Sequence, residues 1–125
     1  MKFYSVLFGL VTIVLSGCKF LPIMTKDETI DAAVGKWEHK DLNKSDVKAI
    51  IFTKKKDTQG DSICITQYKK KDNNGNMADT GVWRFAGVGK IEIWNVYSKD
   101  WVLPFTLTDR STMLLNNDDL YVKDQ

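Results

Sequence analysis

The chain has 125 residues, 43% of them hydrophobic, and a formal net charge of +2 at pH 7. This length fits a single domain, and so small a charge does not favour nucleic-acid binding. Two lysine runs, 54–56 and 69–71, are each followed by Asp and turn residues, so we expect them at opposite ends of one strand, as solvated hairpin flanks.

Residues 1–17 have the features of a secretory signal. Lys2 precedes an uncharged apolar run over residues 3–17, and the small residues Ser16 and Gly17 come directly before Cys18. The alternative, a transmembrane helix, is disfavoured because the run is shorter than the roughly 20 residues that span a bilayer. The sequence therefore predicts a signal peptide over residues 1–17.

The tetrapeptide Leu15-Ser16-Gly17-Cys18 resembles the lipobox of bacterial lipoproteins. The resemblance implies cleavage before Cys18, attachment of lipid, palmitate included, to that residue, and anchoring in a membrane. Lys19 resembles the pattern that sorts lipoproteins of enteric bacteria to the outer membrane, so the expected location is that membrane of the cell envelope, facing the periplasm. Residues 18–24 then form a lipidated tether, and residues 25–125 form the folded domain.

The chain has two cysteines. With lipid on Cys18, Cys64 has no partner, so no intrachain disulfide is expected. Cys64 lies in the apolar run Ile63-Cys64-Ile65, which predicts a small buried hydrophobic side chain rather than a reactive thiol.

One short helix is predicted over residues 26–34. Thr25 and Glu28 have the spacing of a capping box, and Ile30, Ala33 and Val34 follow at helical intervals. After Gly35 the chain changes to short segments rich in β-branched and aromatic residues, most of them separated by turn residues. The expected strands are residues 36–39, 47–54, 62–70, 80–86, 90–98, 101–108, 112–115 and 120–123.

Strands at intervals of about ten residues are typical of an all-β sandwich or barrel. Short connections make neighbouring strands antiparallel, and closing the meander removes exposed edges. We therefore expect a small antiparallel up-and-down barrel of about eight short strands, preceded by one short helix. Alternation along the strands predicts an inward set: Ile50, Phe52, Ile63, Ile65, Trp83, Phe85, Ile91, Ile93, Phe105, Leu107, Met113 and Leu115.

Gly35-Lys36-Trp37 opens the first strand directly after the helix and resembles the start of a lipocalin. The alternating segments that follow, from 50–53 to the terminal Tyr121, resemble the small lipocalin-like domains of bacterial lipoproteins. The resemblance covers residues 31–123 and implies a lipocalin-like barrel. It also implies that Trp37 closes the barrel floor against a basic residue, Arg84 or Arg110, by cation–π stacking.

Two functions follow. In the first, the barrel is a binding module whose cavity holds a small apolar ligand, with Trp83, Phe85, Ile93 and Phe105 as lining residues. In the second, the barrel is filled and docks to an envelope protein through exposed aromatic side chains. An eight-stranded barrel is just wide enough for either. The candidates for partner contact are Trp94, Tyr97 and Trp101.

The second face of the strand over residues 90–98 is also apolar, because Trp94 and Val96 lie on it. We expect this face to pack under the helix, with an exposed patch for a partner as the alternative. His39 is the only histidine and is expected at a solvated strand edge. With one histidine, one available thiol and no nucleophile-elbow motif, we predict no metal site, cofactor or enzymatic activity.

Overall fold

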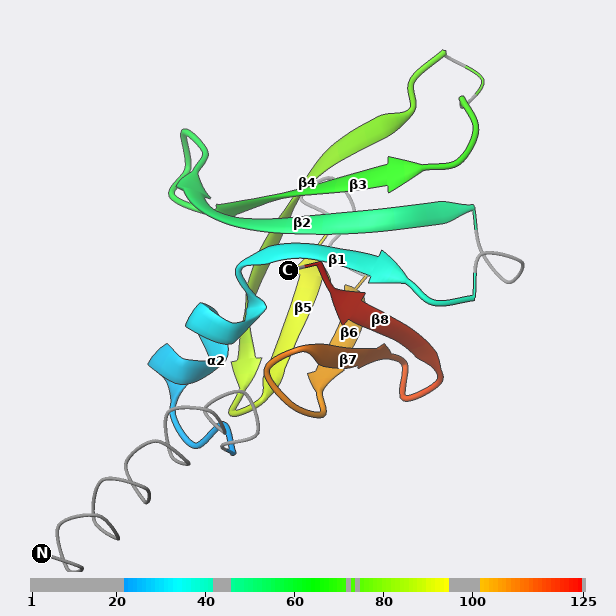
Figure 1. Ribbon diagram of the computed structural model, residues 1–125. Coiled ribbons are helices and arrows are strands. Elements are labelled where there is room, and N and C mark those ends of the chain that lie inside the picture. The colour runs from blue at the N-terminus through cyan, green and yellow to red at the C-terminus, as the bar shows by residue number, and fades with distance from the viewer. Residues whose placement is uncertain (1–21, 42–45, 72, 74, 95–101, 125) are drawn as a thin grey trace, which may run out of the picture.

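The computed structural model describes residues 22–41, 46–71, 73, 75–94 and 102–124 (Figure 1). The predicted signal peptide, the predicted lipidation site Cys18 and the candidate contact residues Tyr97 and Trp101 lie outside these ranges. The described helix is α2 (Lys26–Ala33). The strands are β1 (Gly35–His39), β2 (Val47–Lys56), β3 (Ser62–Tyr68), β4 (Ala78–Gly87), β5 (Lys90–Trp94), β6 (Val102–Leu107), β7 (Thr112–Leu115) and β8 (Asp119–Lys123).

The strands form a closed antiparallel barrel. Each strand pairs with the next one in sequence, and β8 pairs with β1 to close the barrel. Closure gives every one of these strands two hydrogen-bonded neighbours, which protects the sheet from edge-to-edge association. The predicted all-β, up-and-down, lipocalin-like barrel with one preceding helix is confirmed.

α2 lies across one end of the barrel, near the turn between β4 and β5 (Figure 1). The Thr25 side chain caps it by accepting a hydrogen bond from the Glu28 N–H at 3.1 Å, as the capping box predicts. The inner side of the helix buries Thr29, Ala32 and Ala33 against the barrel. Within the described residues, no helix has the length and apolar character needed to cross a bilayer.

Aromatic rings occupy the barrel interior. Phe52 meets both Trp83 and Phe105 edge to face, with ring centroids 5.4 and 5.8 Å apart, and Phe105 meets Tyr121 in the same way at 5.8 Å. Such T-shaped contacts are a favoured geometry for aromatic pairs. The chain of rings therefore crosses the interior from β4 to β8. The other large, fully buried side chains are Trp37, Ile91, Met113, Thr29 and Cys64.

The inward face of β3 differs from the prediction. Cys64 pairs with the inward-facing Phe52 and is buried, whereas Ile63 and Ile65 alternate with it on the outer face and are half-buried. All three residues are apolar, so alternation alone could not select the inward face. The register with β2 selects it, and it confirms that Cys64 is a buried small side chain.

His39 is also buried, contrary to the expected solvated position. It follows Trp37 by two residues and therefore lies on the same inward face of β1. Its ring packs edge-on against Tyr121 with centroids 4.8 Å apart. Asp119 Oδ1 lies 3.9 Å from His39 Nε2 at the edge of this contact.

Candidate functional site

Three of the four residues predicted to line a ligand cavity belong to the packed core. Trp83 and Ile93 are cross-strand partners on β4 and β5, and both join Phe105 in one buried cluster. The indole N–H of Trp83 donates to the Thr53 carbonyl oxygen at 2.9 Å. The fourth residue, Phe85, is half-buried near α2, with Lys26 Nζ 5.5 Å from its ring centroid.

Trp37 lies between α2 and the last strand. Its indole N–H donates to the Ala33 carbonyl oxygen at 2.8 Å, and its side chain is fully buried. The basic partner is Lys123 of β8, whose Nζ lies 5.6 Å from the ring centroid. The same ammonium donates to the Ala32 carbonyl oxygen at 2.8 Å, and burial lowers its pKa. Trp37 thus joins helix and barrel.

The expected partners of Trp37 have other roles. Arg110 donates from Nη2 to Glu28 Oε2 at 2.8 Å, which ties the β6–β7 turn to the first turn of α2. Arg84 lies over the Trp94 ring, with Cζ 4.9 Å from its centroid. The sequence could not separate these basic residues from Lys123, because the pairing of β8 with β1 alone brings Lys123 opposite Trp37.

A cleft of about 510 Å³ opens between α2 and the adjoining ends of the barrel strands. Lys54 Nζ lies 2.7 Å from Asp31 Oδ1, and the hydrogen bond and charge of Lys54 lower the pKa of Asp31. Lys56 Nζ donates to Ser62 Oγ at 2.8 Å. The cleft can take a small molecule with an apolar body and a polar rim. Its lining residues are Asp27, Ile30, Asp31, Lys54, Lys56, Ser62 and Trp83.

A continuous row of apolar side chains crosses the outer face of the barrel from β2 to β6, and we name it the outer stripe. Cross-strand pairs join Ile51 to Ile65 and connect Ile63, Val82, Trp94 and Val102 in series, and Ile63 and Ile65 lie two residues apart on the outer face of β3. All are half-buried except Val82, which is buried. The members of the outer stripe are Ile51, Ile65, Ile63, Val82, Trp94 and Val102.

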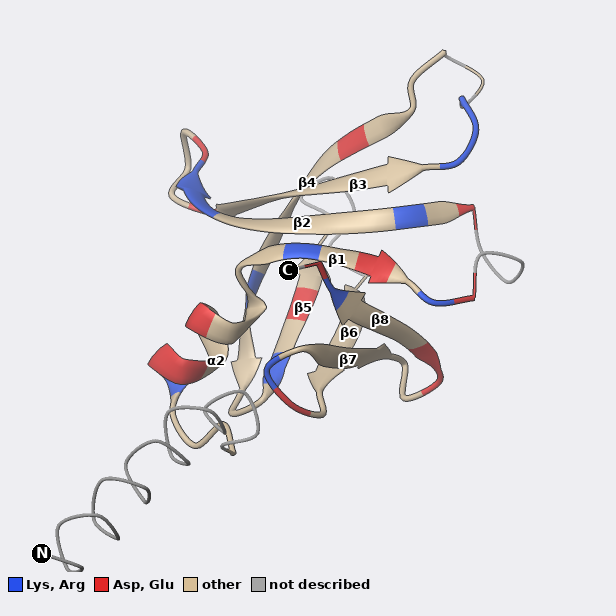
Figure 2. Ribbon diagram, viewed as in Figure 1, with Lys and Arg blue, Asp and Glu red and all other residues tan. Residues whose placement is uncertain are grey.

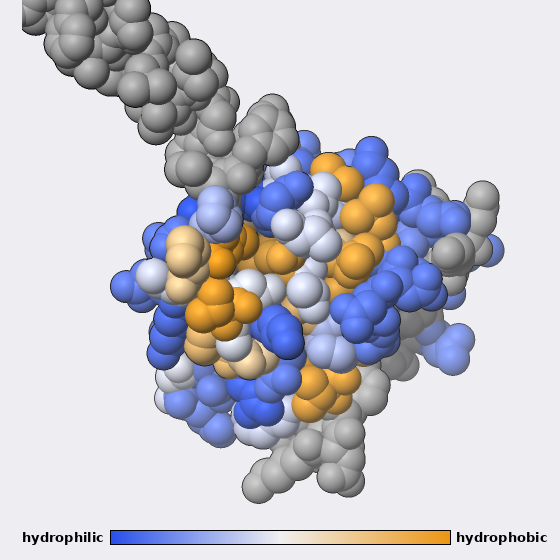
Figure 3. Space-filling view, turned by 90° about the horizontal axis from the view of Figure 1, so that it is seen from below, coloured by the Kyte–Doolittle hydropathy of each residue, from blue (hydrophilic) through white to orange (hydrophobic). Residues whose placement is uncertain are grey.

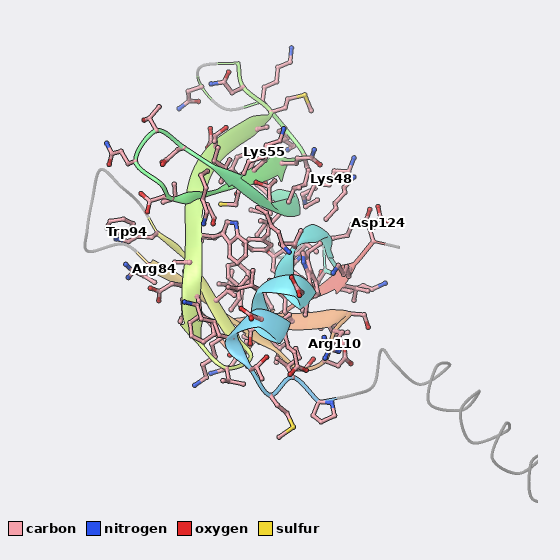
Figure 4. The ribbon with its side chains drawn as sticks, turned by 90° about the vertical axis from the view of Figure 1, so that its left-hand side faces the viewer. Lys48, Lys55, Arg84, Trp94, Arg110 and Asp124 are labelled. Atoms are coloured by element: carbon pink, nitrogen blue, oxygen red, sulfur yellow. The ribbon has the colours of Figure 1, made fainter. Side chains whose placement is uncertain are left out.

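Trp94 is the aromatic residue of the outer stripe (Figure 4). Arg84 stacks on its ring and forms an ion pair with Glu92, which lies opposite it on β5. α2 meets the other end of this hairpin, where the Thr29 hydroxyl accepts a hydrogen bond from the Gly89 N–H at 2.9 Å. The expectation that α2 packs over Trp94 is therefore wrong, because the helix covers the end of the barrel and not its wall.

The sequence did not predict the outer stripe, because several strands are apolar on both faces. Ile50-Ile51-Phe52 and Ile63-Cys64-Ile65 each supply both core residues and stripe residues. That doubly apolar composition was the available signal, and it marks strands whose outer face is also covered or bound. Which of the apolar residues face outward follows only from the register between strands.

Among the described residues, the buried thiol of Cys64 has no sign of reactivity. Burial raises the pKa of the Cys64 thiol to about 12, so the thiol stays protonated and is a poor nucleophile. Across the described ranges, no three His, Cys, Asp or Glu side chains are grouped to share a metal ion. The two lysine runs lie at opposite ends of β3, as predicted (Figure 2).

No protein-family model, no curated protein and no solved structure matches the chain.

Proposed function

We propose that the chain is a lipid-anchored lipoprotein of the bacterial cell envelope whose barrel is a non-enzymatic interaction module for a protein partner. The anchor is lipid on Cys18, and the location is the outer membrane, on the periplasmic side. We favour a protein partner over an internal ligand because a chain of aromatic rings crosses the barrel interior.

A ligand inside the barrel would displace side chains that the fold needs. Trp83, Phe52, Phe105 and Tyr121 pack in series, each within 6 Å of the next by ring centroid. Removing one buried ring of this size costs about 3–5 kcal/mol of stability. Since an eight-stranded barrel is only wide enough for side chains or one small ligand, this filling favours binding at the outside.

The outer stripe supports a protein as the partner. It combines aliphatic side chains with Trp94, on which Arg84 stacks, and Trp and Arg are the residue types enriched at interface hot spots. Arg84 is held between Glu92 and the Trp94 ring, so the side chains of Arg84 and Trp94 are ordered before any partner binds. Ordering in advance reduces the entropy lost on binding.

A second candidate function is binding of a small ligand in the cleft beside α2. The apolar side chains of Ile30 and Trp83 and the paired charges of Asp31 and Lys54 favour a compact amphipathic molecule there. In this second candidate function, the small ligand binds at the end of the barrel and not in the barrel interior.

Cys18→Ser tests the anchor. The variant chain is expected to stay unprocessed or to partition into the aqueous phase of a detergent extraction, because it cannot receive acyl chains. Three acyl chains exceed the two membrane signals that stable anchoring takes. Normal processing and detergent-phase partitioning of Cys18→Ser would contradict the lipoprotein assignment.

A photo-crosslinking residue at position 65 tests the partner surface. Leu120 is a matched control, because it is an exposed apolar residue on β8, away from the outer stripe. We expect a discrete protein adduct from position 65 that is absent from position 120 and lost with Trp94→Ser. An apolar molecule that co-purifies with the barrel, together with no adduct from position 65, would favour the ligand-binding function instead.

A further inference from the structure

We infer that the α2 end of the barrel lies against the bilayer surface, with Met24 and Val88 inserted among the lipid headgroups. This inference rests on the proposed lipidation of Cys18. It adds an orientation to the anchor and identifies a second contact with the membrane. The occupant of this surface is the phospholipid headgroup layer of the membrane that holds the anchor.

The covalent distance to the anchor is short. Residues 19–21 separate Cys18 from Pro22, and four Cα–Cα steps span at most about 14 Å in any conformation. The polar layer of one leaflet is roughly 5–8 Å thick. Pro22 therefore lies at or close to the membrane surface, whatever path the intervening residues take.

The first described residues are fixed to one end of the barrel. Ile23 packs against the hydrophobic core, and Pro22 and Ile23 line a cleft of about 390 Å³ together with Val88 and Leu107. The chain therefore leaves the barrel next to the β4–β5 turn. A domain held at this point by a short tether cannot turn its opposite end to the same membrane.

The β4–β5 turn presents an apolar side chain at its tip. Val88 stands between Gly87 and Gly89, whose positive φ angles of 148° and 73° form a tight turn. Hydrogen bonds from the Gly89 N–H to Thr29 and from the Leu107 N–H to the Gly89 carbonyl hold this turn rigidly. Val88 is nevertheless 51% exposed, and Met24 beside the exit point is 71% exposed.

The surroundings of these two residues suit a headgroup layer. Lys26 and Lys90 are both exposed at this end, and long lysine stems can lie along apolar surface while the ammonium reaches phosphate. Asp27 lies at the same end, so the surface carries both signs of charge and does not require an anionic lipid. Figure 3 shows this end of the molecule, where apolar side chains are ringed by hydrophilic ones.

The chain offers a matched control at the other end of the barrel. Met77 precedes β4 and is 50% exposed, nearly the same fraction as Val88. β4 separates the two positions along its whole length. If exposed apolar residues entered lipid regardless of position, Met77 would do so as well as Val88.

The test labels Val88→Cys and Met77→Cys in the full lipidated chain with an environment-sensitive fluorophore. The native thiol of Cys64 is buried and protonated, so labelling at the new cysteine is selective. The proteins are placed in vesicles of phosphatidylethanolamine and phosphatidylglycerol. We expect a blue-shifted emission and quenching by brominated lipid for the label at 88, and the emission of an aqueous label at 77.

The remaining outcomes separate the inference from the proposed function. Aqueous emission from both labels on a chain shown by mass spectrometry to carry lipid overturns the inference and leaves the anchor intact. A blue shift at 88 without quenching by brominated lipid also overturns it, because the side chain is then covered by protein. A chain without acyl groups would refute the lipid anchor. If the label at position 88 of such a chain is still quenched by brominated lipid, the membrane contact is supported without the anchor. If that label has aqueous emission, the membrane contact and the anchor are both refuted.

Discussion

At the scale of single residues, the Gly35-Lys36-Trp37 motif has a direct physical explanation. Gly35 has a φ of +137°, and a Cβ at this position would lie 2.7 Å from Lys123 Cε. The missing side chain therefore leaves room for Lys123 to cross to the Trp37 ring and the Ala32 carbonyl. Glycine, tryptophan and lysine act together to join the end of α2 to β1 and β8.

Trp37→Ala is expected to lower the free energy of unfolding by about 3–5 kcal/mol, because it removes a fully buried ring and one buried hydrogen bond. Urea unfolding followed by circular dichroism measures the change. Trp94→Ala is the matched control, since it removes the same side chain from the barrel wall and should cost clearly less. Equal costs would mean that Trp37 does not close the floor.

Gly35→Ala is expected to cost about 1–3 kcal/mol, because alanine must adopt a φ that favours glycine. Part of the cost is the displacement of Lys123, so Gly35→Ala should be less destabilising when introduced into Lys123→Ala. Unfolding free energies of the four chains form a double-mutant cycle. A coupling energy of zero would show that Lys123 moves aside freely.

At the scale of elements, α2 is attached to the barrel through Thr29. The Thr29 hydroxyl donates to the Thr25 carbonyl at 2.8 Å and accepts from the Gly89 N–H at 2.9 Å, although the residue is fully buried. One side chain thereby connects the helix to the β4–β5 turn. The same connection holds the Val88 tip in place at the proposed membrane surface.

Thr29→Val keeps the shape of the side chain but leaves the Gly89 N–H without its acceptor. An unsatisfied buried polar group costs about 1–3 kcal/mol, and we expect a loss of that size in unfolding experiments. Thr80→Val, at an exposed position of β4, should stay within about 0.5 kcal/mol of the original chain. Faster amide exchange at Gly89 in Thr29→Val would report the loosened turn directly. An unchanged exchange rate would contradict this role of Thr29.

At the scale of the whole molecule, the buried acids limit stability at high pH. Burial raises the pKa of Cys64 from 9.0 to about 12, and burial, with the charge of Asp119, raises that of Tyr121 from 10.0 to about 12. In the unfolded chain, Cys64 loses its proton above pH 9 and Tyr121 loses its proton above pH 10, while the folded chain retains both protons. At these two groups the unfolded state then binds fewer protons, so the stability that they contribute is fully present below pH 9 and falls as pH rises toward 12.

We expect the free energy of unfolding to decline above pH 9, at no more than about 1.4 kcal/mol per pH unit for each group. Urea unfolding at closely spaced pH values measures this slope. Cys64→Ala should remove the decline between pH 9 and 10 while lowering stability by a constant amount at neutral pH. The same slope in both chains would assign the alkaline loss to other groups.

The sequence by itself determined the helix, the strands and their antiparallel order. Thr25 and Glu28 specify the start of α2 locally, and turn residues such as Gly87-Val88-Gly89 interrupt the apolar segments where β4 ends and β5 begins. Short connections between such segments leave little choice except an up-and-down meander. These features depend on residues close together in the chain, which explains why they could be predicted.

Only the tertiary structure decided which side chains meet across the barrel. Cys64 faces inward because β3 pairs with β2 in one register, His39 is buried because it shares the inward face of Trp37, and Lys123 reaches Trp37 because β8 closes on β1. The outer stripe with Trp94 likewise exists only once five strands are aligned. Each of these contacts joins residues on different strands, and a one-residue shift in register exchanges the two faces of a strand, so local patterns could not specify them.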